Sequence, residues 1–263
     1  MKLYSLNISN NNFLLNKKQN KVSFGASSRW YDLKDYSLSM PMGNFTNMFR
    51  KDVDWFELAK YEHELFTNED KVNVIQFAAS TGAEAYSKII SLIEAYSREK
   101  AQKFFPIKAV DIDSDIIDIA KSGLINFNQS EINDFVTKKS DIQKYFKPYE
   151  YNLALASDNC SVKQKTYSAK DILKNNVNFE VGDMFKMAKD IDNTSCSIVL
   201  ARNSLSYFNA FLKENFIEVI ASKLKPKSLF IIGELETEID TDIVPLLQQH
   251  NFKKVMKNVF QKN

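Results

Sequence analysis

Short apolar runs recur along the chain, and each is followed by small or polar residues. The run at residues 229–232, Leu-Phe-Ile-Ile, is continuous rather than alternating. Continuous runs are typical of strands that are covered by helices on both faces, whereas a strand with one wet face alternates. We therefore expect buried strands at residues 72–77, 107–110, 177–181, 197–201 and 229–232, with a final strand near 253–256.

Between these runs lie segments whose apolar residues recur every three or four positions. Tyr86, Ile89 and Ile93 fall on one face of a helix, which marks the side that packs on a sheet. Gly123 fits the end of a second helix that carries Ile116. Further helices are expected at residues 55–65, 212–224 and 243–249. The alternation of strands and helices predicts an α/β fold with a doubly wound, mostly parallel sheet.

Two segments interrupt this alternation. Residues 1–43 show no sustained period and are expected to form an N-terminal arm, either a loosely packed tail or a segment that lies over the site or docks a partner. Residues 124–176 are polar and rich in tyrosine, and we interpret them as a small inserted subdomain with a short antiparallel sheet. The main domain is expected to span residues 44–263.

The turn at residues 78–84, Ala-Ala-Ser-Thr-Gly-Ala-Glu, is the strongest local indication of a binding site. It joins an expected strand to the start of an expected helix, where free backbone N–H groups and the helix dipole favour a ligand. Small residues allow a cofactor to approach the backbone closely. Asp111, at the end of the next strand, suits the hydroxyl pair of a ribose. Only Gly82 remains of the usual glycine-rich pattern, so an ordinary strand–turn–helix is the alternative.

Composition narrows the classes of partner. The 35 basic and 33 acidic residues leave a net charge of +2, which gives no support for binding nucleic acid or membranes. Cys160 and Cys196 have neither disulfide-framework nor metal-ligand spacing, and His63 and His250 have no evident metal partner, so no metal site is expected. The absence of a long apolar run and of a signal-peptide core leads us to expect a cytoplasmic protein without membrane insertion.

Five separated motifs together resemble the CheR family of S-adenosylmethionine-dependent methyltransferases, which methylate glutamate side chains of chemotaxis receptors. The resemblance covers roughly residues 44 to 235 and depends on the order and spacing of the motifs. They are residues 44–50 (Asn-Phe-Thr-Asn-Met-Phe-Arg), 78–87, 110–113 with 120–123, 201–208 (Ala-Arg-Asn-Ser-Leu-Ser-Tyr-Phe) and 224–226. It implies a Rossmann-like, class I methyltransferase sheet, the cofactor S-adenosyl-L-methionine, and a protein substrate with a methyl-accepting glutamate.

The resemblance also implies roles for individual residues. The residues expected to bind the cofactor are Asn44, Thr46, Ala78, Gly82, Glu84, Asp111, Asp183, Met184, Arg202 and Asn203. Among them, Asp111 would contact the ribose and Asp183 would lie near the adenine. The residues expected on the catalytic, substrate side are Arg50, Arg202 and Tyr207. Taken singly, Arg50 could instead pair with Asp52 or Asp54, Arg202 could cap a sheet edge, and Tyr207 could belong to the core.

Those three side chains suit a carboxylate acceptor. A glutamate with a pKa of about 4.3 is already ionised at neutral pH and needs no general base. Arginine forks match the geometry of a carboxylate, and a phenol donates a hydrogen bond.

The sequence departs from the family at Ala83 and Ala85, where an acid and a proline are usual, and the family's N-terminal helical domain is reduced to the arm. These departures leave open a second hypothesis, a non-catalytic cofactor-sensing or protein-binding module on a methyltransferase scaffold. A nucleic-acid methyltransferase is disfavoured, because the five prolines are never adjacent and neither cysteine follows a proline.

Overall fold

A computed structural model describes residues 30–33, 38–41, 47–127, 141–149, 165–240 and 242–263. At its centre is a seven-stranded sheet with the order β11-β12-β10-β9-β3-β4-β8. The strands are β3 (Asn73–Phe77), β4 (Ile107–Asp111), β8 (Val177–Val181), β9 (Ser197–Ala201), β10 (Leu229–Ile232), β11 (Phe252–Met256) and β12 (Val259–Lys262). The strands from β10 to β8 are all parallel, whereas β12 runs antiparallel to both of its neighbours.

The connectivity places a topological switch point between β3 and β9. From β3 the chain proceeds to β4 and β8 on one side, and it then returns to β9 and β10 on the other side. In open α/β sheets, ligands bind outside the carboxyl ends of the strands at such a point. The loops that follow β3 and β9 therefore define the most favourable place for a ligand.

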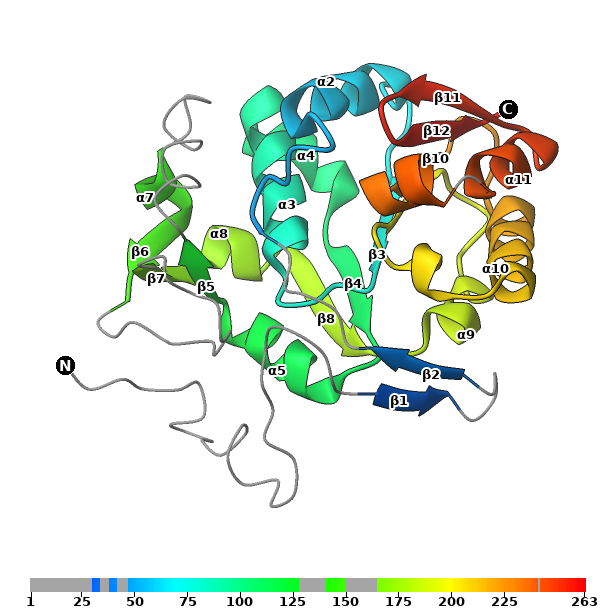
Figure 1. Cartoon of the computed structure of the whole chain (residues 1–263). Helices are drawn as coiled ribbons and strands as arrows, with labels where there is room; N and C mark the ends of the chain where they lie inside the picture. Colours follow the sequence, from blue (N-terminus) through cyan, green and yellow to red (C-terminus); the bar gives the residue numbers. More distant parts are fainter. Residues whose placement is uncertain (1–29, 34–37, 42–46, 128–140, 150–164, 241) are drawn as a thin grey trace.

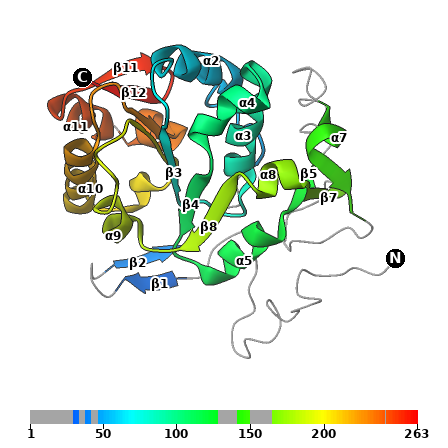
Figure 2. The same cartoon turned by 180° about the vertical axis from the view of Figure 1, so that it is seen from behind.

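Helices cover both faces of the sheet (Figures 1 and 2). One face packs against α2 (Trp55–Leu65), α3 (Ala83–Ala95) and α5 (Ser114–Ser122). The other face packs against α9 (Met184–Ala188), α10 (Ala210–Lys223) and α11 (Ile243–Gln249). The central strands are buried throughout, which explains their continuous apolar sequence.

Local sequence signals fix where several helices begin and end. Asp54 accepts hydrogen bonds from Phe56 N and Glu57 N at the start of α2, and Asn209 accepts one from Leu212 N at the start of α10. The helix α5 ends at Gly123, which has a φ of 71°. Short helical segments fill the remaining connections: α4 (Arg98–Ala101), η1 (Gln102–Phe104), η2 (Leu205–Tyr207) and the π-helix η3 (Leu235–Ile239).

The segment between α5 and β8 carries a second sheet. Its strands β5 (Leu124–Phe127), β6 (Phe146–Pro148) and β7 (Lys165–Ala169) pair antiparallel in the order β5-β7-β6, with α7 (Ile142–Tyr145) and α8 (Asp171–Lys174) beside them. Near the other end of the chain, β1 (Trp30–Leu33) and β2 (Leu38–Pro41) form an antiparallel pair. The division into an arm of residues 1–43 and a main domain of residues 44–263 stays a prediction.

The doubly wound, mostly parallel sheet is confirmed. The strands expected at residues 177–181, 197–201 and 229–232 have the observed bounds. The strand β12 was not predicted, because it ends in Gln261 and Lys262 and so carries little apolar signal. The helices α4, α8 and α9 were not predicted either, because four or five residues are too few for a helical period to appear. Among the described helices, none has both the length and the apolar character needed to cross a membrane.

Candidate functional site

The loop after β3 has an unusual backbone conformation. Ala78, Ser80 and Gly82 all have positive φ angles, of 53°, 51° and 85°. Two of these residues are not glycine, and such strained conformations cluster at ligand-binding sites. Gly82 begins α3, and a Cβ atom there would lie 2.6 Å from Cζ of Phe179, so both the backbone angle and the packing require glycine.

Asp111 at the end of β4 holds this loop in place. Its Oδ2 atom accepts a hydrogen bond of 2.9 Å from Ser80 N, and its Oδ1 atom accepts one of 3.1 Å from Asp113 N. Burial raises the pKa of this carboxyl group, and the two backbone N–H donors oppose that rise. Each carboxylate oxygen keeps a further lone pair, so Asp111 can still accept hydrogen bonds from a diol.

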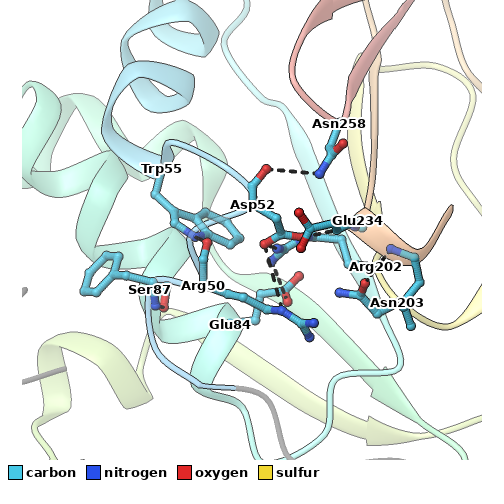
Figure 3. Close-up of polar contacts among 12 residues, drawn as sticks. Arg50, Asp52, Trp55, Glu84, Ser87, Arg202, Asn203, Glu234 and Asn258 are labelled. Carbon is cyan, nitrogen blue, oxygen red and sulfur yellow. Dashed lines mark hydrogen bonds and ion pairs between the residues drawn. The ribbon is translucent and has the colours of Figure 1, made fainter. Parts of the chain in front are cut away.

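A buried ion cluster lies at the end of β9, on the other side of the switch point (Figure 3). The Nη1 atom of Arg202 lies 2.7 Å from Oε2 of Glu84, and its Nη2 atom donates a hydrogen bond to Oδ1 of Asp52. The guanidinium also stacks over the ring of Trp55, 5.0 Å from the ring centroid. Burial raises the pKa of Glu84, and the charge of Arg202 opposes that rise. The cluster thus brings two predicted residues, Glu84 and Arg202, into direct contact.

Arg50 lies at the edge of the same cluster. Its Nε atom is 4.0 Å from Oδ1 of Asp52, the atom that Arg202 also contacts. Arg50 O accepts a hydrogen bond of 3.2 Å from Trp55 Nε1, and Phe49 N donates one of 2.8 Å to Ser87 Oγ on α3. The Arg50 side chain is 40% exposed, whereas that of Arg202 is 1% exposed. The alternative pairing of Arg50 with Asp52 is therefore present, but within a cluster that also contains Arg202.

A buried carboxylate organises the loops that follow β9 and β10. Glu236 accepts hydrogen bonds from the backbone N–H groups of Asn203, Leu205 and Gly233, at 2.8, 3.0 and 2.9 Å. Asn203 has a φ of 51°, and its Oδ1 atom accepts a hydrogen bond from Leu235 N. A Cβ atom at Gly233 would lie 2.4 Å from the Asn203 side chain, so the two loops meet closely.

The other predicted residues lie at different places around this edge. Tyr207 is in η2 with a 41% exposed side chain, so it does not belong to the core. Asp183 follows β8 and accepts a hydrogen bond from Phe185 N as the N-cap of α9, and Met184 packs on the core beneath. Asn44 and Thr46 lie outside the described residues.

Two buried carboxylates of this region were absent from the predicted set. Asp52 joins Arg202 to the segment before α2, and Glu236 joins the loops after β9 and β10. Asp52 drew attention only as a possible neighbour of Arg50, because sequence spacing cannot show a partner 150 positions away. Glu236 lies in a π-helix of 5 residues, which is too short for a hydrophobic period to appear in the sequence.

The fold and the switch-point loops define a class of protein that binds a nucleoside-containing cofactor at the carboxyl ends of parallel strands. Residues 44–252 match the model of the CheR methyltransferase SAM-binding domain. The chain therefore belongs to the CheR family, and its cofactor is S-adenosyl-L-methionine. The match favours a methyltransferase over the hypothesis of a non-catalytic module.

Curated relatives are consistent with this family. Chemotaxis protein methyltransferase 2 of Vibrio cholerae is 24% identical over 166 residues, which cover 63% of this chain and 51% of the relative. Chemotaxis protein methyltransferase 2 of Pseudomonas aeruginosa is 25% identical over 196 residues, covering 73% of this chain and 63% of the relative. The chain spans about half the length of the first of these relatives.

Solved structures that resemble the chain include magnesium protoporphyrin IX methyltransferase from Synechocystis with bound SAM, at 12% identity and a TM-score of 0.37. That match covers 79% of this chain and 78% of the other. N-methyltransferase NodS from Bradyrhizobium japonicum, in complex with S-adenosyl-L-homocysteine, matches at 8% identity and a TM-score of 0.37, covering 81% and 89% of the two chains.

The described residues fit this cofactor. Asp111 offers carboxylate oxygens beside the strained loop of residues 78–82, as a ribose diol requires. Among the described residues, the buried Nε atom of Arg202 has no hydrogen-bond partner. A buried donor without a partner is costly unless a ligand completes it.

Proposed function

We propose that this protein transfers a methyl group from S-adenosyl-L-methionine to the carboxylate of a glutamate side chain in a protein substrate. The observation that supports the proposal most is that Arg50 and Arg202 both contact the Asp52 carboxylate, beside the switch-point loop. Arg50, whose side chain is 40% exposed, can bind a carboxylate with two parallel hydrogen bonds. Arg202 contacts Asp52 and Glu84 with its two terminal nitrogens and would offer its buried Nε donor beside Arg50. The names of the relatives, chemotaxis protein methyltransferases, support a protein substrate from the same kind of signalling system.

Different residues would bind different parts of S-adenosyl-L-methionine. Asp111 would accept hydrogen bonds from the ribose hydroxyl groups, and the backbone of residues 78–82 would lie against the nucleoside. Asp183, at the carboxyl end of β8, would lie on the adenine side, with Met184 next to it. Glu84 and Asn203 would border the methionine end, because both lie next to Arg202. Asn44 and Thr46 stay predictions for the same cofactor.

When bound, the cofactor supplies a methyl group on a positively charged sulfur. Arg50, Arg202 and Tyr207 would hold the acceptor carboxylate in line with that methyl group, so that the new O–C bond forms as the S–C bond breaks and its electrons return to sulfur. The acceptor is already ionised at neutral pH, so no side chain has to remove a proton. The rate acceleration would therefore come from positioning of the acceptor and exclusion of water. Neither histidine is needed: His63 packs against Tyr96 and Phe104, and His250 follows α11.

The product provides the test, because a methyl ester of a carboxylate is hydrolysed by alkali and releases methanol, whereas a methylated amine is stable. We would incubate the purified protein with methyl-labelled S-adenosyl-L-methionine and the cytoplasmic fragment of a bacterial chemoreceptor. We expect label in the fragment that alkali releases as methanol and that mass spectrometry maps to glutamate. Alkali-stable label, or no transfer by a protein that binds the cofactor, would contradict the proposal. Substitution of the mapped glutamate by glutamine is the matched control.

A further inference from the structure

Asp52 connects three parts of the molecule at the candidate site (Figure 3). Its side chain is 2% exposed, and its Oδ1 atom accepts a hydrogen bond from Nη2 of Arg202. Its Oδ2 atom accepts one of 3.2 Å from Glu234 N, just after β10. Its main-chain oxygen accepts one of 3.0 Å from Nδ2 of Asn258, in the turn between β11 and β12. The segment before α2 is thus tied to the loops after β9 and β10 and to the β11–β12 turn.

These contacts determine the direction of the Arg202 side chain. One terminal nitrogen of the guanidinium contacts Asp52 and the other contacts Glu84, while its face lies on Trp55. With Asp52 removed, Glu84 would be the remaining carboxylate in contact with the guanidinium among the described residues, and the guanidinium could then turn around that single contact. The orientation of the planar fork matters, because carboxylate recognition by arginine depends on its geometry.

The same contacts set the place of Arg50. This residue is two positions before Asp52, and its Nε atom lies 4.0 Å from the Asp52 carboxylate. Anchoring Asp52 by three hydrogen bonds therefore fixes the backbone that carries Arg50 relative to Arg202. Small displacements of positioning groups can reduce a rate by about 100-fold.

We propose that Asp52 is a positioning residue that orients the Arg202 guanidinium and holds Arg50 beside it for methyl transfer. This inference rests on the proposed function for its catalytic consequence. The orientation of Arg202 is a separate claim that can be measured without any transfer. The assignment depends on contacts with β9, the loop after β10 and the β11–β12 turn, which lie far from Asp52 in the sequence.

The test compares Asp52→Asn, which keeps the shape of the side chain and removes its charge, with Asp54→Asn. Asp54 is an exposed carboxylate two positions away that caps α2, and asparagine caps a helix equally well. Asp52→Glu is the conservative variant. Fluorescence is recorded with Trp30 replaced by phenylalanine, so that the tryptophan emission comes from Trp55, which lies against Arg202. The melting temperature of each variant shows whether it is folded.

We expect Asp52→Asn to lower kcat by about 30-fold and to change the Trp55 emission. Asp54→Asn should leave both unchanged, and Asp52→Glu should recover part of the rate. Unchanged Trp55 emission in folded Asp52→Asn would overturn the proposal, as would an unchanged kcat. If the parent protein transfers no methyl group but its Trp55 emission still depends on Asp52, the proposed function fails and the orientation of Arg202 by Asp52 stands.

Discussion

Two buried clusters of acidic and basic side chains lie on the same side of the central sheet, and their surroundings differ. In one, Lys88 of α3 contacts both carboxylate oxygens of Glu62 on α2, and both side chains are at most 1% exposed. In the other, Arg202 lies between Asp52 and Glu84 at the switch point. The first is a closed pair inside regular helices. The second extends to the 40% exposed side chain of Arg50, the Nε atom of Arg202 has no hydrogen-bond partner among the described residues, and strained loops lie next to it.

The difference indicates which cluster serves the fold and which serves a ligand. Burial lowers the pKa of Lys88 and raises that of Glu62, and each partner opposes the shift of the other. Such a pair balances its own charges and leaves no group for a ligand. Around Arg202, by contrast, Ala78, Ser80 and Asn203 are held at positive φ, a cost that persists where function requires the geometry.

The largest effect on stability should come from breaking the closed pair. Replacing Lys88 by methionine leaves Glu62 buried without its partner, which should lower the free energy of unfolding by about 3–5 kcal/mol. Changing both residues, with Glu62→Leu, should recover most of that loss. Urea unfolding of the single and double variants measures both values. A double variant as unstable as the single one would mean that the pair contributes more than mutual neutralisation.

Replacing Arg202 should lower the free energy of unfolding less than Lys88→Met does, but it should reduce the rate of methyl transfer more. Arg202→Lys keeps the positive charge between Asp52 and Glu84 but loses the planar fork, so kcat should fall by about 100-fold with little loss of stability. Single-turnover methyl transfer is the measurement, and Lys88→Met, assayed at a temperature where it is folded, is the control. Equal losses of rate in the two variants would remove the distinction between the clusters.

His63, next to Glu62 on α2, gives a pH-dependent test of the region around the Lys88–Glu62 pair, which we assign to the stability of the fold. Burial, followed by the charges of nearby lysines, lowers the pKa of His63 to about 4. His63 therefore binds a proton more readily in the unfolded chain than in the folded chain. The stability that comes from keeping His63 neutral is complete above about pH 6.5 and is lost as the pH falls toward 4.

His63→Phe should remove that loss, since phenylalanine can pack against Tyr96 and Phe104. Between pH 7 and pH 4, the stability of the variant relative to the parent should rise by about 2 kcal/mol. Methyl transfer should be the same in both proteins at neutral pH. A stability difference that does not vary with pH would contradict the assignment.

The strands could be predicted from sequence because burial on both faces leaves a continuous apolar run, as in residues 197–201 and 229–232. The loop at Gly82 and the acid at Asp111 could be recognised because their chemistry is local. Asp52 could not, since its function depends on Arg202, Glu234 and Asn258, which only the folded chain brings together. The roles of Asp183, Met184 and Tyr207 stay predictions from the family resemblance.

The most direct test of the cofactor site is calorimetric titration with S-adenosyl-L-homocysteine. Asp111→Ala removes the carboxylate that bonds Ser80 N, and Asp118→Asn changes an exposed acid on the neighbouring helix α5 as a control. We predict micromolar binding by the parent and the control, and at least about a 30-fold weaker Kd for folded Asp111→Ala. Equal affinity in all three proteins, or no binding by the parent at millimolar ligand, would contradict a nucleoside site at the β3–β9 switch point.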